Sequence, residues 1–174
     1  MLRIVEETQH GILRGVCTIS AVIANKSDAP GLSLARDRGL KTLCVPSKGK
    51  EQSIFEDALL TTLDRWNPDY LVLAGFMRVL SPSFVAHFPK RIINIHPADT
   101  KLHQGLGAYK WAFANKLKET KVTIHFVDEG VDTGEIIAQF PVDLTGVTTE
   151  AELEKRGLAV EHQIYSKVLR DILI

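Results

Sequence analysis

Two polar side chains stand where the apolar stretch RIINIHP, residues 91 to 97, comes to an end. Asn94 and His96 are two residues apart, and on a β-strand this spacing places both side chains on the same face. Asp132, in the later stretch EGVDTG, is a candidate third member. An amide and a protonated imidazole can stabilise the oxyanion that forms when an amine attacks a carbonyl, while a carboxylate keeps the imidazole charged and helps to remove the amine's proton.

Each of these signals is weak when it stands alone. A histidine at the end of a strand is more often structural or solvated than catalytic, and Asp and Gly dominate turns for conformational reasons. The stretch LAGFMRVLSPSFV, residues 73 to 85, also has two interpretations. Met77, Val79, Leu80 and Val85 can line a pocket for a flat heterocycle with Arg78 at its rim, or the stretch packs beneath the sheet.

Apolar runs alternate along the chain with segments of helical period, which is typical of an α/β fold. The pattern predicts a Rossmann-like, mostly parallel sheet with helices on both faces, a C-terminal antiparallel strand pair and a long final helix. The expected helices are residues 2–12, 30–39, 53–66, 81–88, 108–117 and about 149–173. The expected strands are residues 17–25, 41–45, 69–75, 91–96, 121–128 and 135–142. Two capping boxes are expected, Ser53 with Glu56 and Thr149 with Glu152.

Composition favours a small-molecule partner. Lysine plus arginine and aspartate plus glutamate both total 21, so the net charge is zero and no charged field attracts nucleic acid or a membrane surface. Cys17 and Cys44 fit buried thiols in a reducing cytoplasm, and no apolar stretch approaches the roughly 20 residues that cross a bilayer. We expect a cytoplasmic protein with one domain over residues 1–174 and no bound metal, since no residues have metal-ligand spacing.

The stretches LAGFMRVLSPSF, INIHP and HFVDEGVDTGEIIAQ together resemble the phosphoribosylglycinamide formyltransferases, in the same order and with similar spacing. The resemblance extends from about Leu2 to Leu173. It implies transfer of a formyl group from 10-formyltetrahydrofolate, a cosubstrate, to the amine of glycinamide ribonucleotide in purine biosynthesis. By position, the resemblance makes Asn94, His96 and Asp132 catalytic and assigns Glu161 to the nucleotide substrate. Its folate pocket corresponds to Met77, Arg78, Val79, Leu80, Val127, Asp128, Glu129, Gly130 and Val131.

Several positions depart from the family pattern, and all of them lie on or near the nucleotide side. The family begins with a strand and a Gly-Ser-Asn loop that binds phosphate, and Met1 stands about where that loop should finish. We therefore expect a domain that is short at its N-terminus, with a natural start upstream, or with another segment or a partner chain in place of the strand. After NIHP the family continues Ser-Leu-Leu-Pro, whereas this chain continues Ala98-Asp99-Thr100-Lys101. Gly107 and Leu158 replace a histidine and a polar residue.

These departures leave alternatives for the function open. The chain is expected to be a glycinamide ribonucleotide formyltransferase, another folate-dependent formyltransferase or a formyltetrahydrofolate hydrolase, or a truncated folate-binding relative without catalysis. Two further histidines stay unassigned: His125 suits a core histidine at least as well as a ligand, and His103 lies in a loop that departs from the family. A monomer and a homodimer are both compatible with the sequence.

Overall fold

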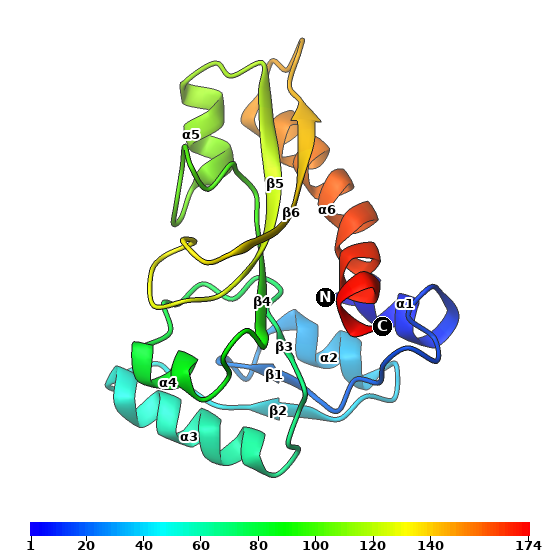
Figure 1. Cartoon of the computed structure of the whole chain (residues 1–174), viewed down its shortest axis with the longest axis vertical. Helices are drawn as coiled ribbons and strands as arrows, with labels where there is room; N and C mark the ends of the chain where they lie inside the picture. The colour runs from blue at the N-terminus through cyan, green and yellow to red at the C-terminus, as the bar shows by residue number, and fades with distance from the viewer. The chain divides into compact units, whose positions relative to one another are not determined.

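The structure, a computed structural model, describes residues 1–174, and the chain divides into two compact units. One unit comprises Met1–Asp69 with Leu173–Ile174, and the other comprises Tyr70–Ile172. Figure 1 labels their helices and strands. One domain over residues 1–174, short at its N-terminus, stays a prediction. None of the helices is both long enough and apolar enough to cross a lipid bilayer.

The first unit contains a two-stranded parallel sheet and three helices. Strands β1 (Val22–Ala24) and β2 (Thr42–Cys44) pair with Ile23 opposite Leu43. The helices are α1 (Leu2–His10), α2 (Pro30–Arg36) and α3 (Gln52–Asp64). Phe55, Leu59 and Leu63 are buried at intervals of four residues, so α3 turns one apolar face inward.

The second unit is built on a four-stranded sheet in the order β3-β4-β5-β6. Its strands are β3 (Leu71–Val72), β4 (Ile92–His96), β5 (Glu119–Phe126) and β6 (Ile136–Asp143). β3 and β4 run parallel, whereas β4 with β5 and β5 with β6 run antiparallel. The predicted C-terminal antiparallel pair, β5 with β6, is confirmed, and the connection between them is a true loop.

Three helices complete this unit: α4 (Pro82–Ala86), α5 (Ala108–Ala114) and α6 (Glu150–Leu173). Figure 1 shows α5 on one side of β5 and β6 and α6 on the other, as expected for an α/β fold with helices on both faces. The long final helix is confirmed. Tyr165 fixes it to the sheet, because its buried hydroxyl donates to the Leu73 carbonyl oxygen at 2.9 Å and lies 3.2 Å from the Ile93 carbonyl oxygen.

Of the two expected capping boxes, one does not form and the other forms in part. The box at Ser53 is wrong, since α3 begins one residue earlier and its N-cap is Glu51, without a side-chain cap bond. At α6 the Thr149 hydroxyl accepts the Glu152 N–H at 3.2 Å, which confirms half of the second box. The Glu152 carboxylate accepts the N–H of Thr148 rather than that of Thr149. The strands over 17–25 and 69–75 are much shorter than expected, as only Val22–Ala24 and Leu71–Val72 pair.

Candidate active site

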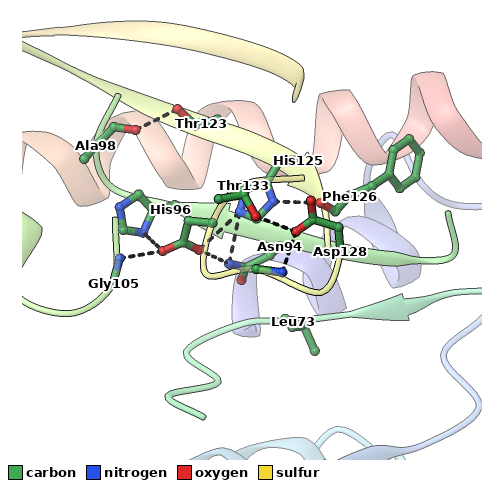
Figure 2. Close-up of polar contacts among 12 residues, drawn as sticks. Leu73, Asn94, His96, Ala98, Gly105, Thr123, His125, Phe126, Asp128 and Thr133 are labelled. Carbon is green, nitrogen blue, oxygen red and sulfur yellow. Dashed lines mark hydrogen bonds and ion pairs between the residues drawn. The ribbon is translucent and has the colours of Figure 1, made fainter. Parts of the chain in front are cut away.

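Strand β4 places Asn94 and His96 at its end, and β5 adds a third polar side chain beside them (Figure 2). The register sets Asn94 opposite His125 and His96 opposite Thr123. Residues directly opposite in an antiparallel pair point to the same face of the sheet. The polar cluster therefore contains His125 as well as the two residues of β4.

Asp132 reaches this cluster from the loop of residues 127–135, which joins β5 to β6. Its Oδ2 atom lies 3.2 Å from His96 Nδ1 and accepts the Gly105 N–H at 2.8 Å. Its Oδ1 atom accepts from Asn94 Nδ2 at 3.3 Å. The side chains of Asp132 and His96 are only 11% and 7% exposed. The structure thus brings together, in a site shielded from water, the three residues that the sequence singles out.

The backbone of Asp132 adopts a conformation that few side chains accept. Its φ angle is +53°, in the left-handed region, which Asn and Asp enter more readily than most other residues. The loop around it is held by Asp128, whose Oδ1 accepts the Gly130 N–H at 3.0 Å and the Thr133 hydroxyl at 2.7 Å. At Gly134 an added Cβ would overlap the Phe126 carbonyl oxygen, so the loop returns to the sheet through a position that requires glycine.

The His125 ring is held in place by three neighbours. Its Nδ1 lies 2.9 Å from the Phe126 carbonyl oxygen, which only accepts, so Nδ1 carries the proton (Figure 2). Its Nε2 is 3.4 Å from Asn94 Nδ2 and 3.3 Å from Asp132 Oδ1. Nε2 thus lies between the Asn94 amide and the Asp132 carboxylate, which also accepts from that amide. The Asn94 amide is therefore oriented from two sides.

His96 is placed between two acceptors. Nδ1 faces the Asp132 carboxylate, and Nε2 lies 3.2 Å from the His103 carbonyl oxygen. A neutral imidazole has one N–H and satisfies one of them, whereas the imidazolium satisfies both. Burial opposes the cation and lowers the pKa of His96 below its ordinary value, while the Asp132 charge and the His103 carbonyl act in the opposite direction. The hydrogen-bond geometry thus favours a charged His96, whereas burial of the ring disfavours it.

The Asp132 carboxylate is the counter-charge in this arrangement. Burial raises its pKa, but the hydrogen bonds from His125 and the Gly105 N–H and the charge of His96 outweigh burial and leave the pKa below its ordinary value. Asp132 is therefore ionised at neutral pH. A buried carboxylate that orients an imidazole, beside an amide donor, suits stabilisation of a developing oxyanion.

The protein-family model described as formyl transferase matches residues 2–169. This chain belongs to the formyl transferase family. A relative from Escherichia coli, named phosphoribosylglycinamide formyltransferase, is 37% identical over 153 residues, which are 87% of this chain and 72% of the relative. The chloroplastic enzyme of that name from Arabidopsis thaliana is 36% identical and is covered over 53% of its length.

Solved structures of the family match the fold closely. The crystal structure of phosphoribosylglycinamide formyltransferase from Bacillus halodurans superposes with a TM-score of 0.93 at 32% identity, covering 99% of this chain and 88% of that one. Glycinamide ribonucleotide transformylase 1 from Geobacillus kaustophilus also gives 0.93, at 30% identity, with 99% and 92% covered. The expected formyl transferase fold is confirmed.

Formyl transferases use a formyl folate as cosubstrate, and this chain exposes apolar side chains at the expected positions. The exposed fractions are 68% for Met77, 55% for Val79 and 40% for Val131. Such side chains suit the flat face of a pterin. Leu80 is only 5% exposed, so it packs in the core beneath this stretch. No group of three or more His, Cys, Asp and Glu side chains is arranged to hold a metal ion.

Glu161 lies on α6 and is paired with a residue of α5. The Tyr109 hydroxyl donates a short hydrogen bond to Glu161 Oε1. Burial raises the pKa of Glu161, and the bond from Tyr109 partly offsets this rise. Gly157, one turn before Glu161, leaves room for the tyrosine ring, which a Cβ there would overlap. One carboxylate oxygen is thus occupied by the protein itself, and Oε2 is free of this bond.

Three contributions to the site were not assigned from the sequence. From the sequence, His125 suits a core histidine at least as well as a ligand, and only the β4–β5 register shows that it faces Asn94. His103 acts through its backbone carbonyl and Gly105 through its backbone N–H. Backbone groups carry no residue-specific signal, so nothing in the sequence points to these two contacts. The roles of the predicted residues in catalysis and binding remain proposals.

Proposed function

We propose that this chain transfers the formyl group of 10-formyltetrahydrofolate to the amine of glycinamide ribonucleotide, a step of purine biosynthesis. The observation that supports this most strongly is the contact of the Asp132 carboxylate with both His96 and Asn94, at 3.2 and 3.3 Å. The Escherichia coli relative named phosphoribosylglycinamide formyltransferase is 37% identical to the chain over 153 residues. The cytoplasm as its location and small molecules as its partners belong to the same proposal.

In this reaction Asn94 and His96 are the oxyanion donors. The amine nitrogen forms a bond to the formyl carbon, and the carbonyl oxygen gains charge. His96 Nε2 then exchanges the His103 carbonyl for the oxyanion, which is the stronger acceptor. Asn94 contributes an amide proton in the same way, from the amide that now contacts Asp132 and His125.

The protons balance without a further reactant. The amine loses one proton as it is acylated, and the folate nitrogen gains one as its bond to the formyl carbon breaks. Asp132 helps to remove the first proton and keeps His96 charged while the intermediate exists. The carboxylate thus acts on both arms of the reaction, which is consistent with its central position.

The remaining site residues divide between the two substrates. We assign the donor to Met77, Arg78 and Val79, with Leu80 packed beneath them, and to the loop from Val127 through Asp128, Glu129 and Gly130 to Val131. The backbone of that loop is proposed to meet the pterin ring. Glu161 is assigned to glycinamide ribonucleotide, through the carboxylate oxygen that Tyr109 leaves open.

The direct test is to incubate the purified chain with 10-formyltetrahydrofolate and glycinamide ribonucleotide. We expect N-formylglycinamide ribonucleotide and tetrahydrofolate in equal amounts, detected by mass spectrometry and by the absorbance of the folate. The matched control is Asp132→Asn, which is isosteric and should form product at least about 100-fold more slowly.

The other readings of the sequence predict different products. Release of tetrahydrofolate and formate when no glycinamide ribonucleotide is added would identify a hydrolase. Formyl transfer to a different amine would change the acceptor only. Folate binding with neither product would identify a relative without catalysis and would overturn the proposal.

A further inference from the structure

The loop of residues 97–107, between β4 and α5, supplies one backbone contact to His96 and one to Asp132. The His103 carbonyl oxygen lies 3.2 Å from His96 Nε2, and the Gly105 N–H donates to Asp132 Oδ2 at 2.8 Å. Because the loop belongs to no helix or strand, other contacts must fix these two backbone groups. The hydrogen bonds at the start of the loop show what fixes them.

The Asp99 carboxylate accepts hydrogen bonds from three residues, and Asp99 is only 9% exposed. Its Oδ1 accepts the Lys101 N–H at 3.1 Å and Gln139 Nε2 at 3.2 Å, and its Oδ2 accepts Lys121 Nζ at 2.8 Å. Its own carbonyl oxygen accepts the His103 N–H at 3.0 Å. Asp99 therefore connects the strands directly to the residue whose carbonyl contacts His96.

The strands add a second connection one residue earlier. Gln139 on β6 also donates to the Thr123 hydroxyl at 3.0 Å, and that hydroxyl donates to the Ala98 carbonyl oxygen at 2.6 Å (Figure 2 shows the Thr123–Ala98 bond). Thr123 and Gln139 are paired in the β5–β6 ladder. The loop is thus bound through Ala98 and Asp99 to two strands that are themselves paired.

The charge on Asp99 is stable within this network. Burial raises the pKa of its carboxyl, but the hydrogen bonds from Lys121, the Lys101 N–H and Gln139 outweigh burial and leave the pKa below its ordinary value. The ion pair with Lys121 is therefore present at neutral pH.

We propose that Asp99 is a positioning residue for the reaction: through Lys121 and Gln139 it holds the His103 carbonyl in contact with His96. The effect on turnover rests on the proposed formyl transfer, whereas the effect on His96 does not. Without the Asp99 carboxylate, the loop loses its bonds to Lys121 and Gln139 and keeps the Thr123–Ala98 bond alone, so the His103 carbonyl is held less firmly. His96 then faces Asp132, His125 and the His103 ring with a weaker contact to this acceptor.

The experiment compares Asp99→Ala with Asp143→Ala. Asp143 is the matched control. Its Oδ1 accepts the N–H of Thr145, two residues later, at 2.8 Å, just as Asp99 accepts that of Lys101. The Asp143 side chain, however, is exposed and bonds to no loop of the site. We expect Asp99→Ala to lower kcat by roughly 10- to 100-fold with the KM for formyl folate changed less than about twofold, as for a misplaced catalytic group. Asp143→Ala should leave both unchanged.

A second readout is independent of activity. The His96 imidazole is titrated by NMR in each protein, and the weaker contact with the His103 carbonyl in Asp99→Ala should lower its pKa relative to the unmodified chain. Lys121→Met, which removes only the ion pair, should shift kcat and the His96 pKa in the same direction by smaller amounts. It also serves if Asp99→Ala does not fold.

The outcomes separate this inference from the proposed function. If the unmodified chain forms no formyl product but the His96 pKa falls in both variants, the inference holds and the proposed function fails. If kcat and the His96 titration in Lys121→Met and in any folded Asp99→Ala match those of the unmodified chain, Asp99 has no positioning role.

Discussion

At the scale of single residues, the Asp132 carboxylate connects three segments of the chain. It contacts His96 and Asn94 on β4, His125 on β5 and the backbone of Gly105. Each of these partners donates to it, so the carboxylate fixes the orientation of an imidazole and an amide at once. Replacing any one partner should therefore affect the chemistry more than the binding of substrates.

His96→Ala tests the oxyanion donor. Removing the imidazole should lower kcat by about 100-fold or more while the KM for formyl folate changes little, because the group acts on charge that develops in the transition state. Steady-state kinetics measure both constants. His87→Ala, at an exposed histidine after α4, is the control and should retain full turnover. Unchanged turnover in His96→Ala would remove this residue from the mechanism.

Asp132→Asn tests the source of the imidazole's charge. The carboxylate raises the pKa of His96 against the effect of burial, so its neutral isostere should let that pKa fall further. NMR titration of the His96 ring gives the value directly. Asp64→Asn, at the exposed end of α3, is the control and should leave the pKa of His96 unchanged. An equal or higher value in Asp132→Asn would contradict the assigned role.

At the scale of elements, the site depends on how β5 lies against β4. The sequence predicted both strands and placed Asn94 and His96 at the end of one of them. It did not predict that His125 would face Asn94, because the pairing of two strands 31 residues apart depends on contacts that local periodicity does not contain. The capping box at Ser53 failed for a related reason, since α3 begins one residue earlier than its polar pattern indicates.

The contact between α5 and α6 is closely packed at Gly157. An alanine there should gain about 0.5–1 kcal/mol from helix propensity. Its Cβ would overlap the Tyr109 ring, and such overpacking typically costs about 1–3 kcal/mol. We therefore expect Gly157→Ala to lower the free energy of unfolding in urea.

The same substitution in a Tyr109→Ala background should have the opposite sign. With the ring absent, only the propensity gain remains, and Gly157→Ala should raise the free energy of unfolding of that variant. Destabilisation of similar size in both backgrounds would show that the tyrosine ring is not what requires glycine at this position.

At the scale of the whole molecule, the family and most of the site were predictable from sequence because short motifs carry them. INIHP and EGVDTG contain all three polar side chains, and their order identifies the formyl transferase fold. The loop of residues 97–107 was not predictable, as its contacts with His96 and Asp132 are made by backbone groups. Its anchor, Asp99, departs from the family pattern, so only the structure shows what it binds.

The stability of the second unit should depend on pH through His96. Burial lowers the pKa of this imidazole from its ordinary value of 6.5 in the folded chain. As the pH falls below 6.5, the unfolded chain binds a proton here that the folded chain still resists, so folding becomes less favourable until the lower folded pKa is reached. His96→Gln removes this titrating group, so the free energy of unfolding should decrease less steeply as the pH falls through that window.

Trp111 reports on this unit, which comprises Tyr70–Ile172, once Trp66 of the other unit is changed to phenylalanine. Urea unfolding followed by Trp111 fluorescence at several pH values between about 4 and 7 then compares the Trp66→Phe chain with its His96→Gln derivative. As the pH falls, the free energy of unfolding of the Trp66→Phe chain should decrease relative to that of its His96→Gln derivative, because only the chain that retains His96 loses stability through this group. Curves that stay parallel over the whole window would show that the imidazole takes up its proton equally well in the folded and the unfolded chain.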